Sequence, residues 1–147
     1  MELTREADYA LRTMLEVARG STEVTTTAHV SRRRLVPRPF LRKIVPRLTA
    51  AGLLRTRRGK RGGLTLARRA EEIDVLAVID AVSGPVAVNR CVLRPDSCPL
   101  QPICPVHEVC RMVRDEMVRL LGSVHLSDMV ARATELEALR AQRSRAW

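Results

Sequence analysis

Aromatic side chains are nearly absent from this 147-residue sequence, which contains one tryptophan, one tyrosine and one phenylalanine. Because hydrophobic residues still make up 46% of the chain, the core has to be built from aliphatic side chains. The sequence also lacks an apolar run of about 18 residues, which excludes a transmembrane helix. The first residues, Met1 to Glu6, lack the apolar segment of a signal peptide, so we expect a cytoplasmic protein with no membrane partner.

Histidine is scarce as well, with three residues in the chain. No nucleophile stands in a pattern with a base, no pair of acids is spaced for general acid–base chemistry, and no glycine-rich phosphate loop is present. Enzymatic catalysis is therefore not expected.

Acidic residues are missing from one long segment, Val24 to Ala70, which contains fourteen arginine and lysine residues. Since the formal net charge of the whole chain is +10, the other residues sum to −4. The positive charge is therefore local, which is typical of a surface that binds a polyanion. A basic helix on a membrane usually has Trp or Phe on its apolar face, and Phe40 is the only aromatic residue of this segment.

Apolar residues of the basic segment recur at helical spacing between Phe40 and Leu48. The run Arg32–Arg34 marks the end of a shorter helix before them. Pro37 and Pro39 suit the first turn of the longer helix, because the missing N–H of proline costs nothing there. Two helices separated by a short turn are therefore predicted, and the acid-free surface lies on both.

Two β-prone runs follow, residues 53–56 and 64–66, and a linker of glycines and cations joins them. This composition predicts a basic hairpin, and the order helix, turn, helix, hairpin is that of a winged helix-turn-helix. A merely solvated basic surface would not also follow this order. We expect a fold that is mainly α with a small β-wing, in which residues 1–84 form the DNA-binding domain.

Residues 40–64, FLRKIVPRLTAAGLLRTRRGKRGGL, resemble the recognition helix and wing of IscR/NsrR-type bacterial transcription regulators, the Rrf-two family. In that family a homodimer reads a palindromic operator in double-stranded DNA, and many members carry an iron–sulfur cluster. The resemblance implies that Pro39 and Arg42 face bases in the major groove and that Arg58 enters the minor groove. Further cations expected to bind DNA, mainly at phosphates, are Arg38, Lys43, Arg47, Arg57, Lys60 and Arg61.

One residue departs from the family pattern. Pro46 stands where the recognition helix should be continuous, and an interior proline costs about 3 kcal/mol and kinks a helix. We therefore expect a bend between Arg42 and Pro46.

The four cysteines lie within twenty residues of one another, in the pattern C-x6-C-x5-C-x2-H-x2-C that begins at Cys91 and ends at Cys110. In a reducing compartment such thiols are metal ligands or redox-active groups more often than disulfides. The proline-rich loop at residues 85–104 can fold three thiolates around one centre, as cluster-binding loops do. Zinc would accept the same ligands, although the paired C-x2-C units typical of zinc sites are missing.

Cys91, Cys98 and Cys104 resemble the three cluster ligands of the regulator family, with a first interval one residue longer than usual. The resemblance thus implies an iron–sulfur cluster, either [4Fe–4S] or [2Fe–2S].

Three residues are candidates for the fourth ligand of the cluster. His107 stands where IscR-like members have the histidine ligand of a [2Fe–2S] cluster. Asp8 matches the position from which NsrR-like members contribute a carboxylate, from the partner subunit, to a [4Fe–4S] cluster. A surface ion pair with Arg12 would explain Asp8 equally well. We rank Asp8 and His107 equally, and Cys110, which is extra to both patterns, behind them.

Residues 105–147 are expected to form a dimerisation helix and a C-terminal helix capped by Ser127, with a frayed tail from Arg140. The first of these helices carries an apolar stripe longer than a small domain can bury, which suggests pairing with a second copy. The stripe consists of Val106, Val109, Val113, Met117, Leu120 and Leu121.

These features together predict a homodimeric DNA-binding regulator, expected to be a repressor, that senses nitric oxide, redox or iron status through a cysteine-ligated cluster. The alternatives are a cluster-free thiol-switch regulator, a zinc-containing regulator and a small electron-transfer protein. The electron-transfer alternative leaves the fourteen cations unexplained.

Overall fold

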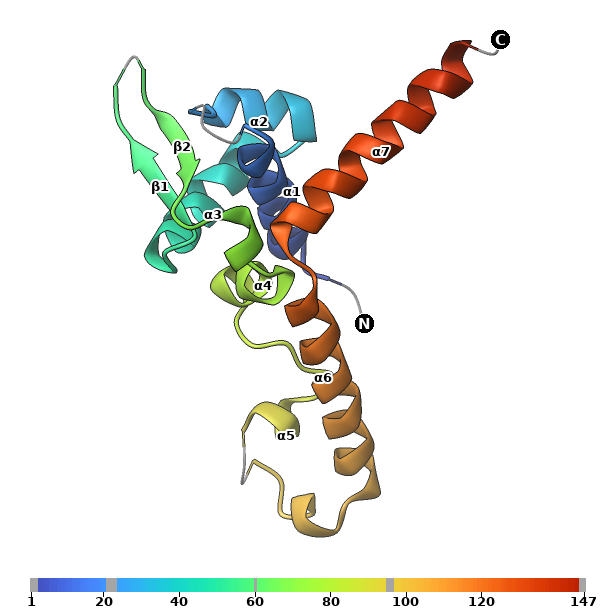
Figure 1. The fold of residues 1–147 in the computed structure, drawn as a ribbon. Helices are drawn as coiled ribbons and strands as arrows, with labels where there is room; N and C mark the ends of the chain where they lie inside the picture. The colour runs from blue at the N-terminus through green and yellow to red at the C-terminus, as the bar shows by residue number, and fades with distance from the viewer. Residues whose placement is uncertain (1–2, 21–23, 60, 95–96, 146–147) are drawn as a thin grey trace.

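The computed structural model describes residues 3–20, 24–59, 61–94 and 97–145. Figure 1 shows a head that contains the hairpin, from which the last long helices of the chain extend. In the head, the elements are α1 (Arg5–Arg19), α2 (Thr27–Arg34), α3 (Arg38–Ala50), β1 (Leu54–Arg57), β2 (Gly63–Leu66), η1 (Ala70–Glu72) and α4 (Val75–Ser83). Beyond it lie α5 (Arg90–Leu93), η2 (Gln101–Ile103), α6 (Pro105–Ser123) and α7 (Leu126–Arg145). The fold class predicted from the sequence is confirmed.

Three helices of the head begin at a side chain that caps the helix. The Thr4 hydroxyl accepts a hydrogen bond from the Ala7 N–H at the start of α1, and the Asp74 carboxylate accepts one from the Ala77 N–H at the start of α4. Thr26 does the same for α2. Each cap satisfies a backbone donor that the first turn of a helix leaves free.

The turn between α2 and α3 is made by Leu35, whose φ of 54° is left-handed. Pro39 lies in the first turn of α3, as the sequence predicts, whereas Pro37 immediately precedes the helix. α3 continues through Pro46 to Ala50 as one helix, so the proline does not end it. The bend itself stays a prediction.

The core of the head is aliphatic. Met14 of α1, Ile44 and Leu48 of α3, and Val78 of α4 are fully buried. Because burying one such side chain contributes roughly 1.5–3 kcal/mol, these contacts fix the recognition helix α3 against α1 and α4.

The hairpin is antiparallel, with Leu54 opposite Leu66 and Arg57 opposite Gly63. Backbone hydrogen bonds between Thr25 and Leu64, 2.8 and 2.9 Å long, fasten it to the segment before α2. A Cβ at position 63 would approach the Thr25 carbonyl oxygen to 2.7 Å, so this site requires glycine. The hairpin is therefore held by the segment before α2 and, through the buried side chain of Leu64, by the core.

α6 and α7 leave the head in different directions (Figure 1). Their junction is fastened to the start of α4 by two backbone hydrogen bonds of 2.9 Å, Val75 N–H to Val124 O and Leu126 N–H to Ile73 O. α6 contains no buried residue, and the cysteines lie at its far end. None of the helices in the described part of the chain is long and apolar enough to cross a membrane.

The structure corrects the sequence prediction at three places. The segment expected to be a plain loop contains α5 and η2, since Asn89 caps a short helical turn. Ser127 lies inside α7 and does not cap it, because the Asp128 carboxylate reaches back to the His125 N–H at 2.9 Å. The tail from Arg140 remains helical as far as the described residues extend, to Arg145.

The left-handed residue in the turn gives a test of stability. Leu35 is 76% exposed, so its side chain contributes little packing, whereas a positive φ costs a side chain with a Cβ about 1 kcal/mol. We expect Leu35→Gly to raise the free energy of unfolding by about 1 kcal/mol in urea titrations. Leu35→Ala keeps the strain and should stay near wild type. A lower midpoint for the glycine variant would mean that the leucine side chain stabilises the turn.

Candidate nucleic-acid interface and thiol segment

The cations of the basic segment fall into two groups. Four arginines form ion pairs with carboxylates, namely Arg33 with Glu137, Arg34 with Glu16, Arg47 with Glu6 and Arg69 with Glu71. The others that the structure describes are exposed and have no carboxylate among the described residues within ion-pair distance. They are Arg32, Arg38, Arg42, Lys43, Arg55, Arg57, Arg58, Arg61 and Arg68.

The unpaired cations of α3 and the hairpin define what we call the basic face: Arg38, Arg42, Lys43, Arg55, Arg57, Arg58 and Arg61. Because no carboxylate of the described residues neutralises them, their charge is available to a polyanion. The set includes most of the residues predicted to bind DNA. Pro39 is exposed in the first turn of α3, and Lys60 lies outside the described residues.

A cavity of about 440 Å³ lies beside this face, where α2 begins. Arg38 and Arg42 line it together with Thr27, Ala28 and the apolar residues around Pro46. The two guanidinium groups thus stand next to the first turn of α2, whose free N–H groups also favour an anion. Such a combination suits a phosphate backbone and an adjacent base edge.

Arg47 is placed differently from the other cations predicted to bind DNA. Its Nη1 donates to a carboxylate oxygen of Glu6, and the same atom donates to the Val82 carbonyl oxygen at 2.7 Å. The guanidinium therefore connects three helices within the head.

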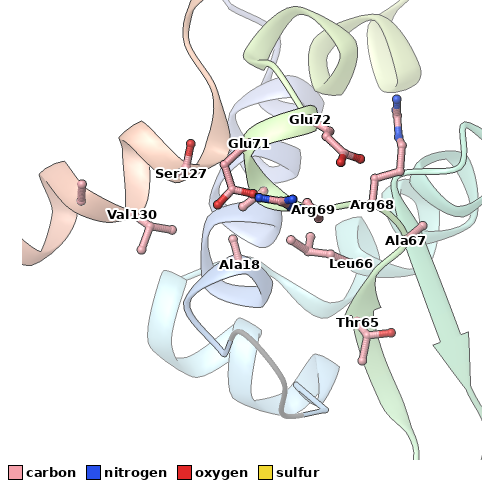
Figure 2. Close-up of a pocket in the computed structure, with 12 residues that line it drawn as sticks. Ala18, Thr65, Leu66, Ala67, Arg68, Arg69, Glu71, Glu72, Ser127 and Val130 are labelled. Atoms are coloured by element: carbon pink, nitrogen blue, oxygen red, sulfur yellow. The ribbon is translucent and has the colours of Figure 1, made fainter.

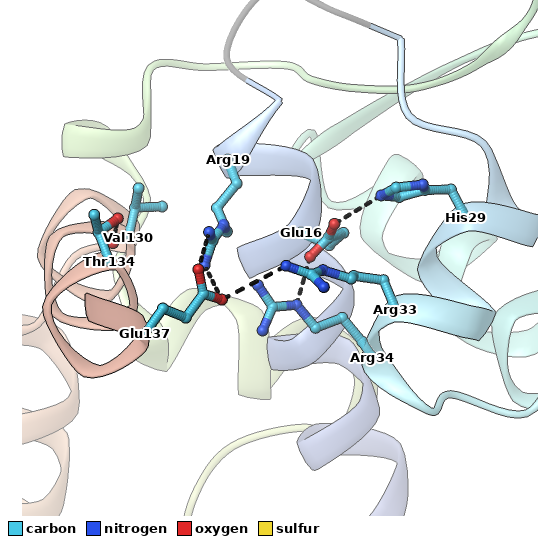
Figure 3. A network of polar contacts seen from close by, with 8 residues as sticks. All are labelled: Glu16, Arg19, His29, Arg33, Arg34, Val130, Thr134 and Glu137. Carbon is cyan, nitrogen blue, oxygen red and sulfur yellow. Dashed lines mark hydrogen bonds and ion pairs between the residues drawn. The ribbon is translucent and has the colours of Figure 1, made fainter. Parts of the chain in front are cut away.

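A polar network behind α2 holds this helix in place (Figure 3). The Glu16 carboxylate, 7% exposed, forms one hydrogen bond with His29 Nε2 at 2.8 Å and one with Arg34. Both partners belong to α2, so the buried carboxylate of Glu16 on α1 fastens α2 to α1. No local sequence pattern reveals this role of His29, because Glu16 lies on another helix.

The same network reaches α7. Arg19 donates two hydrogen bonds to Glu137, at 2.9 and 2.6 Å, and Arg33 lies 3.9 Å from the same carboxylate (Figure 3). The Arg19 hydrogen bond lowers the pKa of Glu137. The C-terminal helix is thereby attached to the DNA-binding head.

The cysteines occupy four different positions at the far end of α6. Cys91 lies in α5, Cys98 precedes η2, Cys104 is the N-cap of α6, and Cys110 is in α6. All four thiols are free and partly exposed.

His107 is the residue around which this segment comes together. Its Nδ1 lies 3.4 Å from the Cys91 sulfur, and it lines a cavity of about 500 Å³ together with Cys98. Within the described ranges, however, no three Cys, His, Asp or Glu side chains are grouped closely enough to hold one metal ion. The donor types thus fit an iron–sulfur cluster, but the described side chains are not gathered around one centre.

The other two candidates for a fourth ligand lie outside this cavity. Asp8 pairs with Arg12 at 2.9 Å, on α1 in the head, whereas the cysteines are at the other end of α6 (Figure 1). Cys110 follows His107 on α6 and does not line the cavity. Asp8 of the same chain therefore does not join the thiols.

A cavity of about 900 Å³ lies between α1, β2, η1 and the first turns of α7 (Figure 2). Its walls combine Ala18, Leu66 and Val130 with Arg68 and the pair Arg69–Glu71. No cysteine or histidine is among the described residues that line it. Any thiol chemistry is therefore separate from it.

A winged helix-turn-helix with an unneutralised basic face defines a DNA-binding protein of the transcription-regulator class. Residues 3–132 match the Rrf2 family, described as iron-dependent transcriptional regulators, and the chain belongs to this family. It is a transcriptional regulator and not an enzyme.

Individual proteins similar to this chain are consistent with the family assignment. The HTH-type transcriptional regulator IscR of Pectobacterium atrosepticum is 34% identical over 131 residues, which cover 88% of this chain and 79% of that protein. The structure of T. potens IscR matches with a TM-score of 0.76 at 22% identity, over 92% of this chain and 90% of that one. The structure of CymR, the global cysteine regulator of B. subtilis, matches with a TM-score of 0.73 at 22% identity, over 90% and 98%.

The division of the cations gives a test with random-sequence duplex DNA. Each phosphate contact contributes about −0.9 to the slope of log affinity against log salt concentration. Arg57→Ala removes an unpaired cation and should make the slope shallower by about one contact. Arg69→Ala, which removes a cation paired with Glu71, is the matched control and should leave the slope unchanged. Equal slopes for the two variants would contradict the division.

Proposed function

We propose that this protein is a homodimeric repressor that senses nitric oxide, redox or iron status through an iron–sulfur cluster bound by Cys91, Cys98 and Cys104. The observation that carries the proposal is the contact between His107 and Cys91, beside a cavity that His107 lines together with Cys98, in a chain whose head has an unneutralised basic face. A cluster would supply a centre that reacts with oxidants and nitric oxide.

For the fourth ligand we infer His107. It is 3.4 Å from the Cys91 sulfur and shares a cavity with Cys98, and it stands one turn after Cys104 on α6. By the family resemblance, a histidine at this position accompanies a [2Fe–2S] cluster. Asp8 is already paired with Arg12, and would have to come from the partner subunit.

The dimer is supported by the exposed apolar side chains of α6. Val106, Val109 and Leu120 are 61%, 59% and 59% exposed, and Val113 is 40% exposed. A stripe of this kind along one helix is unfavourable in water and is normally covered by another protein surface. A second copy with the same stripe would place two basic faces on the two halves of a palindromic operator.

A cluster-free thiol switch is the second candidate, because the four free cysteines of the described structure are not gathered into a three-ligand group. In that case two thiols would form a disulfide and lose two electrons and two protons to an oxidant such as a peroxide.

Cluster ligation is tested by anaerobic purification with visible spectroscopy and analysis of iron and sulfide. We expect a brown wild-type protein, loss of the cluster in Cys98→Ala and in His107→Ala, and retention in Cys110→Ala, which is the matched thiol control. A full cluster in Cys98→Ala would show that the ligands are assigned wrongly. Colourless, iron-free wild type that loses two hydrogens in mass on peroxide treatment would favour the thiol switch.

The dimer is tested by placing lysine on two faces of the same helix. Val109→Lys puts a charge into the apolar stripe and should shift the protein toward monomer in sedimentation equilibrium, because burying an unpaired charge is costly. Glu108→Lys, on the neighbouring polar face, should leave the dimer intact. Dissociation by both variants, or by neither, would argue against this interface.

A further inference from the structure

The last turn of α4 receives a hydrogen bond from the recognition helix. The last four carbonyl groups of a helix lack intrahelical partners. The Val82 carbonyl is one of them, and Arg47 Nη1 of α3 donates to it at 2.7 Å. Among the described residues this is the only hydrogen bond or ion pair between α3 and α4.

The same end of α4 is bonded to α1. Arg47 Nη1 also donates to the Glu6 carboxylate, and the Ser83 and Thr4 hydroxyl oxygens are 2.7 Å apart. The contact therefore joins the last turn of α4, the first turn of α1 and the C-terminal half of the recognition helix. Arg47 is the member that belongs to the recognition helix.

This contact lies next to the segment of the chain that leads to the cysteines. Ser83 ends α4, and residues 84–90, of which Val86 still packs against the core, connect it to Cys91, the first cysteine. A change in the conformation of the cysteine segment can therefore reach the last turn of α4 along this short connection. Buried apolar contacts between α3 and α4 have no direction, whereas a hydrogen bond to one carbonyl depends on where that carbonyl lies.

We propose that Arg47 is a positioning residue that transmits the state of the cysteine segment to the recognition helix, and that it does not bind DNA. This inference rests on the proposed function, because it needs a sensing event at the cysteines. It also replaces the role predicted for Arg47 from the sequence, where a cation on a recognition helix is expected to contact phosphate.

Two variants separate transmission from DNA contact. Arg47→Gln removes the cation, and Glu6→Gln removes the carboxylate that holds it. If Arg47 bound phosphate, Arg47→Gln would make the salt slope on random-sequence duplex shallower by about 0.9, as Arg42→Gln should. Glu6→Gln would then release Arg47 and strengthen binding. If Arg47 positions α3, both variants keep the wild-type slope.

The decisive quantity is the ratio of DNA affinities between the anaerobically purified dimer and the same dimer after treatment with an iron chelator. The probe is a duplex selected from random sequences by the wild-type protein. Coupling free energies typically correspond to about 5- to 150-fold, so we expect a ratio of at least about 5 for wild type and Arg42→Gln. For Arg47→Gln and Glu6→Gln we expect a ratio below about 2. Circular dichroism and urea titration check that both variants fold.

The outcomes distinguish the two proposals. A wild-type ratio near 1 overturns the proposed function and, with it, the transmission. A high ratio that persists in both Arg47→Gln and Glu6→Gln overturns the role of Arg47 alone. A shallower salt slope for Arg47→Gln also overturns it, because Arg47 would then contact DNA.

Discussion

The positions of the carboxylates determine which cations of this protein are paired and which are free. α3 and the hairpin contain no acidic residue, so the cations of the basic face remain unneutralised. Carboxylates approach other cations of the basic segment: Glu6 and Glu16 on α1, Glu71 in η1, and Glu137 on α7. Each forms an ion pair within the protein. These paired charges therefore stabilise contacts inside the protein, and the charges of the basic face remain free.

The basic face and the cysteines are also far apart in the molecule. The basic face belongs to a head with a close-packed aliphatic core, whereas the cysteines lie at the far end of a helix with no buried residue (Figure 1). A signal at the thiols therefore has to pass through α6 or through the chain that joins α4 to Cys91. Both routes meet α4, since its first residues bond to the α6–α7 junction and its last turn bonds to Arg47. α4 is the element that both ends of the protein contact.

The features predicted correctly from the sequence depend on neighbouring residues. The proline start of α3 and the glycine-containing hairpin are each decided within a few residues. The wrong prediction for Ser127 concerns a choice that neighbouring residues do not decide. Ser127 has the right chemistry for a cap, but α7 begins one residue earlier, at Leu126, and Asp128 bonds back to the His125 N–H; a pattern of residue types does not choose between such neighbouring helix starts.

From its sequence alone, this chain is a mainly helical winged-helix protein with a local excess of positive charge and a cysteine-rich segment, because periodicity, turn residues and charge runs are properties of adjacent positions. Only the tertiary structure decided which cations are free, since Glu6 is far from Arg47 and Glu137 far from Arg33 along the chain. It also decided that His107 meets Cys91, and that His29 supports α2 through Glu16. A hydrogen bond or ion pair requires two groups within a few ångströms, and for residues distant in sequence that separation exists only after the helices have packed.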